Sequence, residues 1–432
     1  MNRTSNHDVQ RTTISRLTLR LVPFLFLLYV VAYMDRINVG FAKLQMQGQL
    51  RFSEEVFGLA FAMFFAGYFF FQVPSNLALA RVGARRWIAL LMVLWGLVSS
   101  SMIFVSTPRS FYVLRFLLGA AEAGFFPGVV LYLKDWFPAT ARARTVAWFM
   151  TAGPISGMIG GPISGALLGL HVHGGFAGWQ WLFLLEGLPA IILGGVVLWV
   201  LPDTPREVRW ISTEQCTWLT ETLDAERRIL AGTRTNVMAA FSIGAVWLLA
   251  FVYFALNACS YGISLWLPTV VRSLSGMSNF SIGVLSAVPY ILAAISMVLV
   301  GFHSDRTGER RWHVALSAFV GAVVLVAGAQ LGTLVPVIVG LSLAMMAVSS
   351  MCGPFWAMPS RMLSGAAAAA GIALINSVGN LGGFAGSYIL GHFRNSNGGF
   401  KSGLFMLGFG LALSGGVALL VRSEVEGRPA QE

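Results

Sequence analysis

Four ionisable residues stand inside two long apolar stretches of this 432-residue chain. Asp35 and Arg36 are adjacent in the first stretch, and Arg115 and Glu122 are seven residues apart in the second. An ionisable side chain at membrane depth costs about 2.5–3.5 kcal/mol on insertion scales, so such residues are usually retained for a function. Arginines can bind an anion and carboxyl groups can carry protons, so the four residues indicate an anion pathway with a proton relay.

The spacing of Arg115 and Glu122 predicts that both lie on one helix face, about 10 Å apart along the axis. The two stretches run in opposite directions, so all four residues can approach one region near the midplane of the membrane. One interpretation is that Asp35–Arg115 and Arg36–Glu122 are buried ion pairs that serve only packing, although desolvation makes such pairs poor stabilisers. The interpretation that we favour is functional: Arg36 and Arg115 bind or couple an anion, and Asp35 and Glu122 carry protons.

The two residue types suit these roles for different reasons. Arginine stays protonated and presents a planar fork that matches a carboxylate. A carboxyl group can change its charge, because burial raises its pKa and a neighbouring arginine lowers it. An anion that occupies the arginine therefore changes the proton occupancy of the acid beside it, and proton and anion favour each other's binding.

The composition indicates which elements hold these residues. Hydrophobic residues make up 56% of the chain and charged residues 11%, whereas a soluble domain carries about 25% charged residues. The apolar segments are continuous runs without the alternation of barrel strands, so we expect an all-α membrane protein. Because a spanning helix needs about 20 mostly apolar residues, the sequence predicts twelve spans: 21–45, 56–80, 86–106, 110–134, 144–170, 179–201, 241–270, 281–302, 313–331, 333–359, 367–391 and 402–421.

The loop charges predict the orientation, because lysine and arginine collect on the cytoplasmic side of a membrane. With these spans, 21 of the 29 lysines and arginines lie on the side of the N-terminus, six lie on the other side and two lie within spans. The net charge of +11 therefore reflects topology and does not indicate nucleic-acid binding. We expect a cytoplasmic tail (1–20), a six-helix half (21–201), a cytoplasmic loop with a surface helix (202–240), a second six-helix half (241–421) and a cytoplasmic tail (422–432).

Other kinds of site have little support in the sequence. Cys216, Cys259 and Cys352 have no paired or metal-ligand spacing, and we interpret them as unlinked thiols. No catalytic nucleophile, metal cluster or phosphate-binding loop is recognisable. We therefore expect no enzyme activity, no cofactor and no metal, and we expect a monomer whose partners are the lipid bilayer, protons and a small organic anion.

An internal repeat relates the two predicted halves. Residues 57–87 and 282–312 both end in R-x-G-x-R-R-W, and Ser53 and Ser278 keep the same spacing of 225 residues just upstream. An even number of helices restores the starting side of the membrane, so the repeats are parallel. Parallel repeats with a site at their interface are typical of one large class of secondary transporters.

The second copy of the repeat, G-x-x-x-D-R-x-G-E-R-R, resembles the loop signature of the major facilitator superfamily. The first copy departs from it, because Asn76 replaces the glycine and Ala80 replaces the aspartate. One alternative is that the basic residues of the motif only anchor the loop on the cytoplasmic side. In the family, the motif locks the cytoplasmic gate. Its aspartate can accept a hydrogen bond from the N-terminus of an opposing helix. The resemblance gives a gating role to Gly83, Arg85, Arg86, Gly301, Asp305, Arg306, Gly308 and Arg310.

Longer stretches resemble the anion:cation symporter branch of that superfamily, whose bacterial members take up tartrate, phthalate, sugar acids and similar carboxylates. The matching stretches are PFLFLLYVVAYMDRINVGFA (23–42), VLRFLLGAAEAGFFPG (113–128), WQWLFLLEGLPA (179–190), LPDTP (201–205), HSDRTGERRWHVAL (303–316) and GIALINSVGNLGG (371–383). The resemblance implies the major facilitator fold and a multi-pass protein of the bacterial inner membrane. It also implies that the acids at Asp35 and Glu122 carry protons and that Arg36 and Arg115 engage or couple the substrate.

Weaker candidates complete the predicted site. Tyr33 and Tyr68 can donate hydrogen bonds to substrate hydroxyl groups or can simply pack. Asn376 matches a substrate position of the family, and Trp356 can form a wall of the cavity from the second half. Glu186, near the outer end of the sixth span, is interpreted as a structural or interfacial residue.

The repeat also predicts that the site is asymmetric. The spacing of 225 residues aligns Asp35 and Arg36 with Ser260 and Tyr261, so the second half lacks the charges. We expect the first half to supply protons and anion recognition and the second half to supply mainly neutral contacts.

These observations favour proton-coupled uptake of a small organic anion by alternating access, with the two halves rocking about a central site. An antiporter or exporter of amphipathic compounds would use the same acids without needing both arginines. A non-transporting membrane sensor is a third interpretation. The motifs leave open whether the anion is tartrate, a sugar acid or an aromatic acid.

Overall fold

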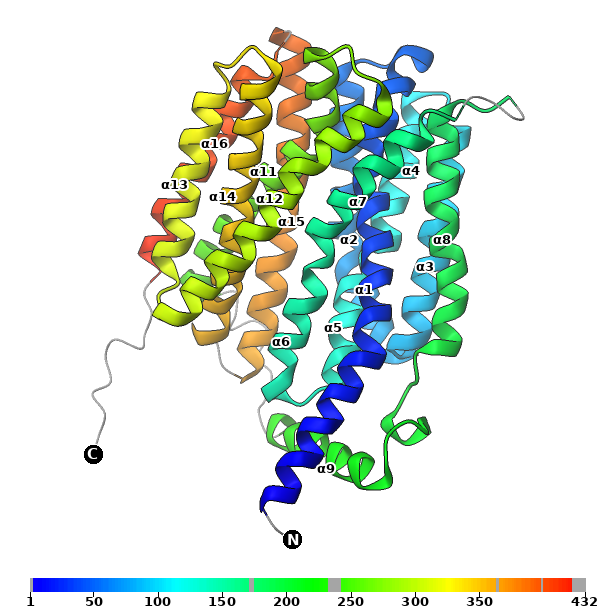
Figure 1. Ribbon diagram of the computed structural model, residues 1–432, viewed down its shortest axis with the longest axis vertical. Coiled ribbons are helices and arrows are strands. Elements are labelled where there is room, and N and C mark those ends of the chain that lie inside the picture. Colours follow the sequence, from blue (N-terminus) through cyan, green and yellow to red (C-terminus); the bar gives the residue numbers. More distant parts are fainter. Residues whose placement is uncertain (1–2, 171–174, 232–241, 363–364, 398, 422–432) are drawn as a thin grey trace.

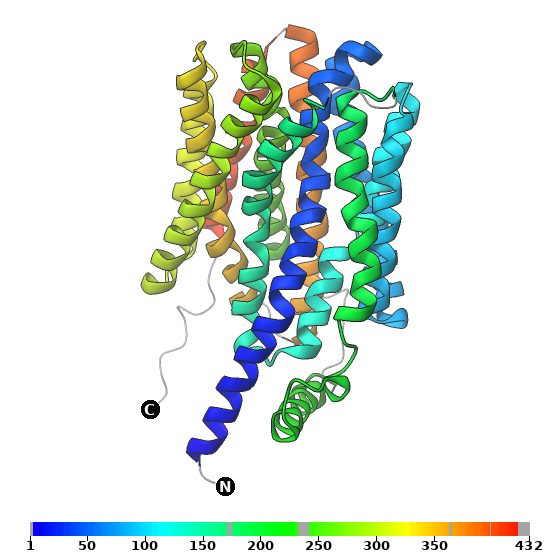
Figure 2. The same cartoon turned by 45° about the vertical axis from the view of Figure 1, so that its right-hand side comes forward.

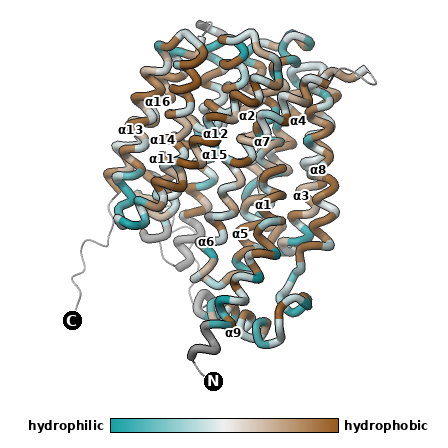
Figure 3. Tube along the Cα trace, in the orientation of Figure 1, coloured by the Kyte–Doolittle hydropathy of each residue, from teal (hydrophilic) through white to brown (hydrophobic). Residues whose placement is uncertain are grey.

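A computed structural model describes residues 3–170, 175–231, 242–362, 365–397 and 399–421, and all regular structure in these ranges is helical. Most helices run side by side in one bundle, whose sides are hydrophobic and whose ends and helix α9 are more hydrophilic (Figures 1 and 3). The helices are α1 (Arg3–Leu50), α2 (Glu54–Val82), α3 (Ala84–Ser100), η1 (Ser101–Phe104), α4 (Pro108–Glu122), α5 (Phe125–Trp136), α6 (Ala139–Met150), α7 (Ala152–Leu167), α8 (Gly178–Val200), η2 (Pro205–Glu207), α9 (Thr213–Ala231), α11 (Gly244–Leu274), α12 (Asn279–Thr307), α13 (Arg311–Gly328), α14 (Leu334–Met362), α15 (Gly365–Asn397) and α16 (Lys401–Leu420).

Ten helical stretches of the described residues are long and apolar enough to cross a membrane. The two other predicted spans, 144–170 and 367–391, correspond to α6 with α7 and to α15. Helix α7 packs against α1 and α12, and α15 packs against α2 and α11, so both are parts of the same bundle. The predicted C-terminal tail lies outside the described residues.

Two predicted spans are divided into shorter helices. Helix α4 ends at Glu122, and α5 begins at Phe125. Pro127 lacks the N–H that would bond the carbonyl of Ala123, and Pro154 has the same effect at the junction of α6 and α7. The hydropathy pattern predicts one continuous helix in each case, whereas the break places Glu122 beside an irregular turn.

Helix α1 is much longer than the predicted span. The expected N-terminal tail is helical from Arg3, and α1 projects beyond the bundle toward α9 (Figures 1 and 2). Arg16 Nη1 donates to Gln215 Oε1 at 3.1 Å, and Gln215 Nε2 donates to Thr12 Oγ1 at 3.2 Å. These bonds attach α9, the surface helix predicted in the central loop, to α1. We call this end of the bundle the α9 end.

The internal repeat is reproduced in the helix ends. Ser53 caps α2 and Ser278 caps α12, each accepting a hydrogen bond from the backbone N–H three residues on, at 3.3 and 3.2 Å. Gly83 and Gly308 end the same two helices with φ of 90° and 71°, a backbone region that favours glycine. Equivalent residues of the two halves therefore start and stop these helices by the same chemistry.

The two halves of the chain meet through α1, α2 and α7 on one side and α11, α12 and α15 on the other. In Figure 1 the first half lies mainly on the right and the second half on the left. Glycines allow the closest crossings, because a Cβ added to Gly58 would lie 3.0 Å from Gly391 Cα, and one added to Gly161 would lie 2.6 Å from the carbonyl oxygen of Gly283.

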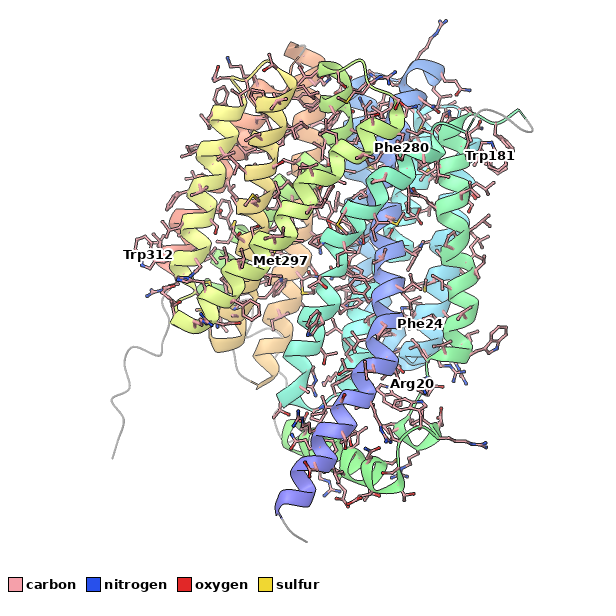
Figure 4. All side chains as sticks on the ribbon, viewed as in Figure 1. Arg20, Phe24, Trp181, Phe280, Met297 and Trp312 are labelled. Atoms are coloured by element: carbon pink, nitrogen blue, oxygen red, sulfur yellow. The ribbon has the colours of Figure 1, made fainter. Side chains whose placement is uncertain are left out.

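These crossings occupy equivalent places in the two repeats. Gly58 and Gly283 are 225 residues apart, and each lies four residues after the start of its helix. Phe280, near the start of α12, and Trp181, near the start of α8, lie toward the end of the bundle opposite α9, whereas Arg20 lies toward the α9 end (Figure 4). The glycines thus hold the halves together near the opposite end.

Candidate functional site

A buried charged cluster lies where the halves meet, as the sequence predicts. Arg36 Nη2 and Nε donate to Glu122 Oε2 at 2.8 and 3.3 Å, and Arg36 Nη1 donates to Tyr261 Oη at 2.8 Å. The Arg36–Glu122 ion pair, which the packing interpretation of the sequence included, is therefore present. We call Arg36, Arg115, Glu122, Tyr261 and Phe64 the central cluster.

The hydrogen bond from Arg36 to Tyr261 shows where this cluster stands. The two residues are 225 positions apart and are therefore equivalent in the repeat. Equivalent positions of two repeats can touch only near the axis that relates them, so Arg36 lies near the centre of the molecule. At this contact a charge of the first half meets a neutral phenol of the second half.

Arg115 has hydrogen-bond donors that the described residues do not use. Its side chain is fully buried, and only Nε has an acceptor, the carbonyl oxygen of Ala60 at 3.4 Å; Nη1 and Nη2 have none within the described ranges. The guanidinium carbons of Arg115 and Arg36 lie 5.0 and 5.1 Å from the centroid of the Phe64 ring, so they are at most about 10 Å apart. Buried donors normally have partners, and the free fork of Arg115 matches a carboxylate.

Asp35 does not join this group. Its Oδ1 accepts from Ser99 Oγ at 2.5 Å and from Asn38 Nδ2 at 3.1 Å, and its Oδ2 has no partner among the residues that the structure describes. The Asp35–Arg115 ion pair of the packing interpretation is therefore not formed among the described residues. Neighbouring residues of a helix point about 100° apart, so Arg36 faces the second half while Asp35 faces α3 within the first half.

Aromatic rings surround Arg36. Its guanidinium carbon lies 5.8 Å from the ring centroid of Tyr33, 5.3 Å from that of Tyr68 and 5.9 Å from that of Tyr261. Tyr33 also stacks on Tyr261 with 6.3 Å between centroids. Both tyrosines predicted for the site therefore lie beside its arginine, where cation–π contacts stabilise the buried charge.

The two predicted residues of the second half, Trp356 and Asn376, lie on α14 and α15. Trp356 packs against aromatic rings of α11 and α14. Asn376 is half-buried on α15 and shares a helix face with Gly383, seven residues away. Gly383 lies against the ring of Phe65, which packs on Tyr261 at 4.6 Å. The face that carries Asn376 is therefore directed to the centre, about 10 Å nearer the α9 end.

A second buried charged cluster, absent from the predicted site, lies near the opposite end of the bundle. Lys43 Nζ lies 2.8 Å from Glu54 Oε2 and donates to Gln47 Oε1 at 2.9 Å and to Thr269 Oγ1 at 3.3 Å, while Arg394 Nε donates to Glu54 Oε1 at 3.2 Å. We call these five residues the end cluster. The end cluster joins α1 and α2 to α11 and α15. It contains Lys43, which is buried, although the count of loop charges in the sequence placed this lysine outside the membrane.

The repeated loop motif lies at the α9 end. Arg310 Nη2 lies 2.6 Å from Asp305 Oδ1, and Arg85 Nη1 lies 2.9 Å from Asp203 Oδ2. Arg85 also donates to the carbonyl oxygen of Leu198. The side chain of Asp305, in the last turn of α12, is 69% exposed and pairs with Arg310 just beyond that helix, so the described residues do not show the contact with an opposing helix that the motif allows. The remaining motif residues stand in the same loops or the adjoining helix turns: Gly83, Arg86, Gly301, Arg306 and Gly308.

The comparison with a known family agrees with this arrangement. Residues 25–387 match the family model of the Major Facilitator Superfamily. The chain belongs to the major facilitator superfamily. This member of the superfamily is thus a multi-pass membrane transporter and not an enzyme.

Individual relatives resemble this transporter over nearly its whole length. A putative tartrate transporter of Agrobacterium vitis is 46% identical over 96% of both chains. A quinolone resistance transporter of Acinetobacter baumannii is 40% identical over 94% of this chain and 95% of its own. An inward-open structure of the xylose transporter of E. coli superposes with a TM-score of 0.75 at 14% identity, over 96% of this chain and 98% of that one, and so has the same fold.

Proposed function

We propose that this transporter takes up a small organic anion together with protons and belongs to the anion:cation symporter branch of its superfamily. The substrate is a carboxylate such as tartrate, a sugar acid or an aromatic acid. The observation that carries the proposal is the buried guanidinium of Arg115, with two unused nitrogen donors beside the Arg36–Glu122 pair. The similarity to a putative tartrate transporter of Agrobacterium vitis makes tartrate the first substrate to test.

The central cluster suggests how anion and proton assist each other. A substrate carboxylate accepts from Nη1 and Nη2 of Arg115, while Arg36 is held by Glu122. A proton on Glu122 weakens that ion pair and frees Arg36 to bind the other end of the anion. Tyr33 and Tyr68 beside Arg36 then contact substrate hydroxyl groups. Binding of a proton thus prepares the site for the anion.

The proposed arrangement in the membrane follows the sequence and the packing. Twelve spans form two six-helix halves, 21–201 and 241–421, with the loop 202–240 between them. The α9 end and both termini face the cytoplasm of a bacterium, because the basic loops collect there. Rocking of the halves about the central cluster exposes it alternately to each side, and the protein works as a monomer.

Transport by purified protein in liposomes tests the proposal. An inward proton gradient should drive accumulation of labelled tartrate above its external concentration, and a protonophore should abolish the accumulation. Unlabelled sugar acids and aromatic acids are added as competitors to rank the substrates. Transport that ignores the gradient would exclude symport, and tartrate binding without flux would favour the sensor interpretation.

A Glu122→Gln variant tests the role of Glu122 as a proton carrier. Glutamine keeps the shape of the side chain but cannot change its charge, so Arg36 is permanently released from an ion pair. Gradient-driven accumulation should be lost, while exchange of internal for external tartrate should continue. Accumulation at the parent level would remove Glu122 from proton coupling.

Export of amphipathic compounds is the second candidate function. It is favoured by the 40% identity to a chain described as a quinolone resistance transporter. The direction of flux separates the two candidates in the same liposomes. An exporter moves a labelled quinolone against an opposing proton flow and does not accumulate tartrate, whereas the proposed symporter does the reverse.

A further inference from the structure

A second buried acid, Glu186 of α8, stands near Asp35 inside the first half. Glu186 is 5% exposed, and its Oε1 accepts from Ser164 Oγ of α7 at 2.7 Å. Asn38 lies between the two acids: its Nδ2 donates to Asp35 Oδ1 at 3.1 Å, and its amide also interacts with Glu186. Glu186 is thus close enough to act electrostatically on Asp35.

This group is short of hydrogen-bond donors and of positive charge. Asp35 Oδ2, Asn38 Oδ1 and Glu186 Oε2 are buried acceptors without a partner within the described residues, and neither acid makes an ion pair there. Burying two ionised carboxylates without a counterion is costly. One added proton removes a negative charge and supplies a donor for one of the empty acceptors, so the geometry favours a protonated pair.

The charged groups around the pair are few. Helices α7 and α8 contain no charged residue besides Glu186, and those of α3, Arg85 and Arg86, stand at its start near the α9 end. From α4, Glu122 and Arg115 act electrostatically on Asp35. Arg115, the proposed anion ligand, is therefore a positive group that acts on Asp35 of this pair.

We propose that Asp35 and Glu186, bridged by Asn38, form a proton-binding site that holds one shared proton, and that Glu186 is a proton-coupling residue of this transporter. The inference rests on the proposed proton symport and adds a site to it. An anion on Arg115 offsets the positive charge that favours ionised Asp35, so anion binding promotes binding of the shared proton. Proton and anion then bind together although they occupy separate clusters.

A Glu186→Gln variant tests this site. Glutamine keeps an oxygen that can accept from Ser164, so a purely structural tie between α7 and α8 survives, but the titratable group is lost. Gradient-driven tartrate accumulation should fall about 5- to 150-fold, the usual range of a coupling free energy. Exchange of internal for external tartrate should remain within about twofold of the parent. The proton flux per tartrate, followed with a pH-sensitive dye inside the liposomes, should also fall.

A matched pair of serine variants keeps the test decisive if Glu186→Gln folds poorly. Ser164→Ala removes the donor to Glu186, and Ser156→Ala removes a buried serine of the same helix whose hydroxyl donates to the backbone carbonyl of Ala152. The first should shift the pH profile of tartrate uptake and the second should leave it unchanged.

The outcomes separate this proposal from the proposed function. If the parent protein accumulates tartrate with the gradient and Glu186→Gln does so equally, Glu186 carries no coupled proton and the further proposal is wrong. A parallel loss of accumulation and exchange at unchanged proton flux per tartrate would make Glu186 merely structural. A parent protein without gradient-driven uptake would instead overturn the proposed symport.

Discussion

The central cluster and the end cluster both bury charges between the two halves of the chain, but their partners differ. In the end cluster, Lys43 has three polar contacts and Glu54 is shared by Lys43 and Arg394. In the central cluster, Arg115 leaves two nitrogen donors without an acceptor among the described residues. The charged groups of the end cluster therefore have nearly all their partners within the protein, whereas Arg115 of the central cluster does not.

This difference indicates what each cluster does. A saturated set of charges that joins α1 and α2 to α11 and α15 stabilises one arrangement of the halves, because separating them breaks the ion pair of Glu54 with Arg394 and the hydrogen bond of Lys43 to Thr269. An unsaturated guanidinium at the centre gains its partner only when an anion binds. We therefore expect changes in the end cluster to alter conformation and changes in the central cluster to alter binding.

The largest effect is expected from Glu54→Gln. Leaving a buried charge without its partner typically costs about 3–5 kcal/mol, so the contact near the opposite end should open more often. Hydrogen exchange of residues 47–58 and 387–394 should become faster by about tenfold or more. Glu55→Gln is the control, because Glu55 is 47% exposed and only approaches His392 at 4.0 Å. Equal exchange in the two variants would contradict a closing role for the end cluster.

Arg115→Lys should act on binding. Lysine keeps the charge but loses the two-pronged geometry, and hydrogen bonds to charged groups contribute about 1.5–3 kcal/mol. Calorimetric titration with tartrate should show affinity reduced by roughly 10- to 150-fold, with exchange near the end cluster unchanged. Arg109→Lys, on the exposed start of the same helix, should bind normally. Parent affinity in Arg115→Lys would remove Arg115 from the anion site.

A smaller effect is expected from Tyr261→Phe. The change removes the oxygen that accepts from Arg36 Nη1 across the halves and retains the ring that stacks on Tyr33. Loss of this bond should change tartrate affinity by about 1 kcal/mol, roughly fivefold. Tyr388→Phe on α15, outside the central cluster, is the control. Equal tartrate affinities of the two variants would show that the hydrogen bond between Arg36 and Tyr261 does not contribute to binding.

The smallest effect is expected from Asn376→Ala. If the second half supplies only neutral contacts, removing one amide should weaken tartrate binding by about 0.5–1 kcal/mol, roughly two- to fivefold. Radioligand competition measures this difference. A loss as large as that of Arg115→Lys would mean that the second half shares anion recognition equally and that the site is not asymmetric.

Much of the fold was predictable because it depends on local signals. Continuous apolar runs identify membrane helices, and the repeat identifies Ser53 with Ser278 and Gly83 with Gly308 as equivalent positions, which the structure places at helix ends. The same spacing pointed to Tyr261 as the counterpart of Arg36. The breaks in the fourth and fifth spans were less visible, because a proline interrupts some membrane helices and leaves others continuous.

The sequence by itself determined that this chain is a helical membrane protein with two repeats and that Arg36, Arg115 and Glu122 are buried charges. Only the tertiary structure decided the partner of each charge. Asp35 and Arg36 are neighbours in sequence, yet a helix turns them about 100° apart, and the helices packed on either side determine which environment each one meets. For that reason Arg36 faces Tyr261 across the halves, whereas Asp35 faces Ser99 and Asn38 within one half.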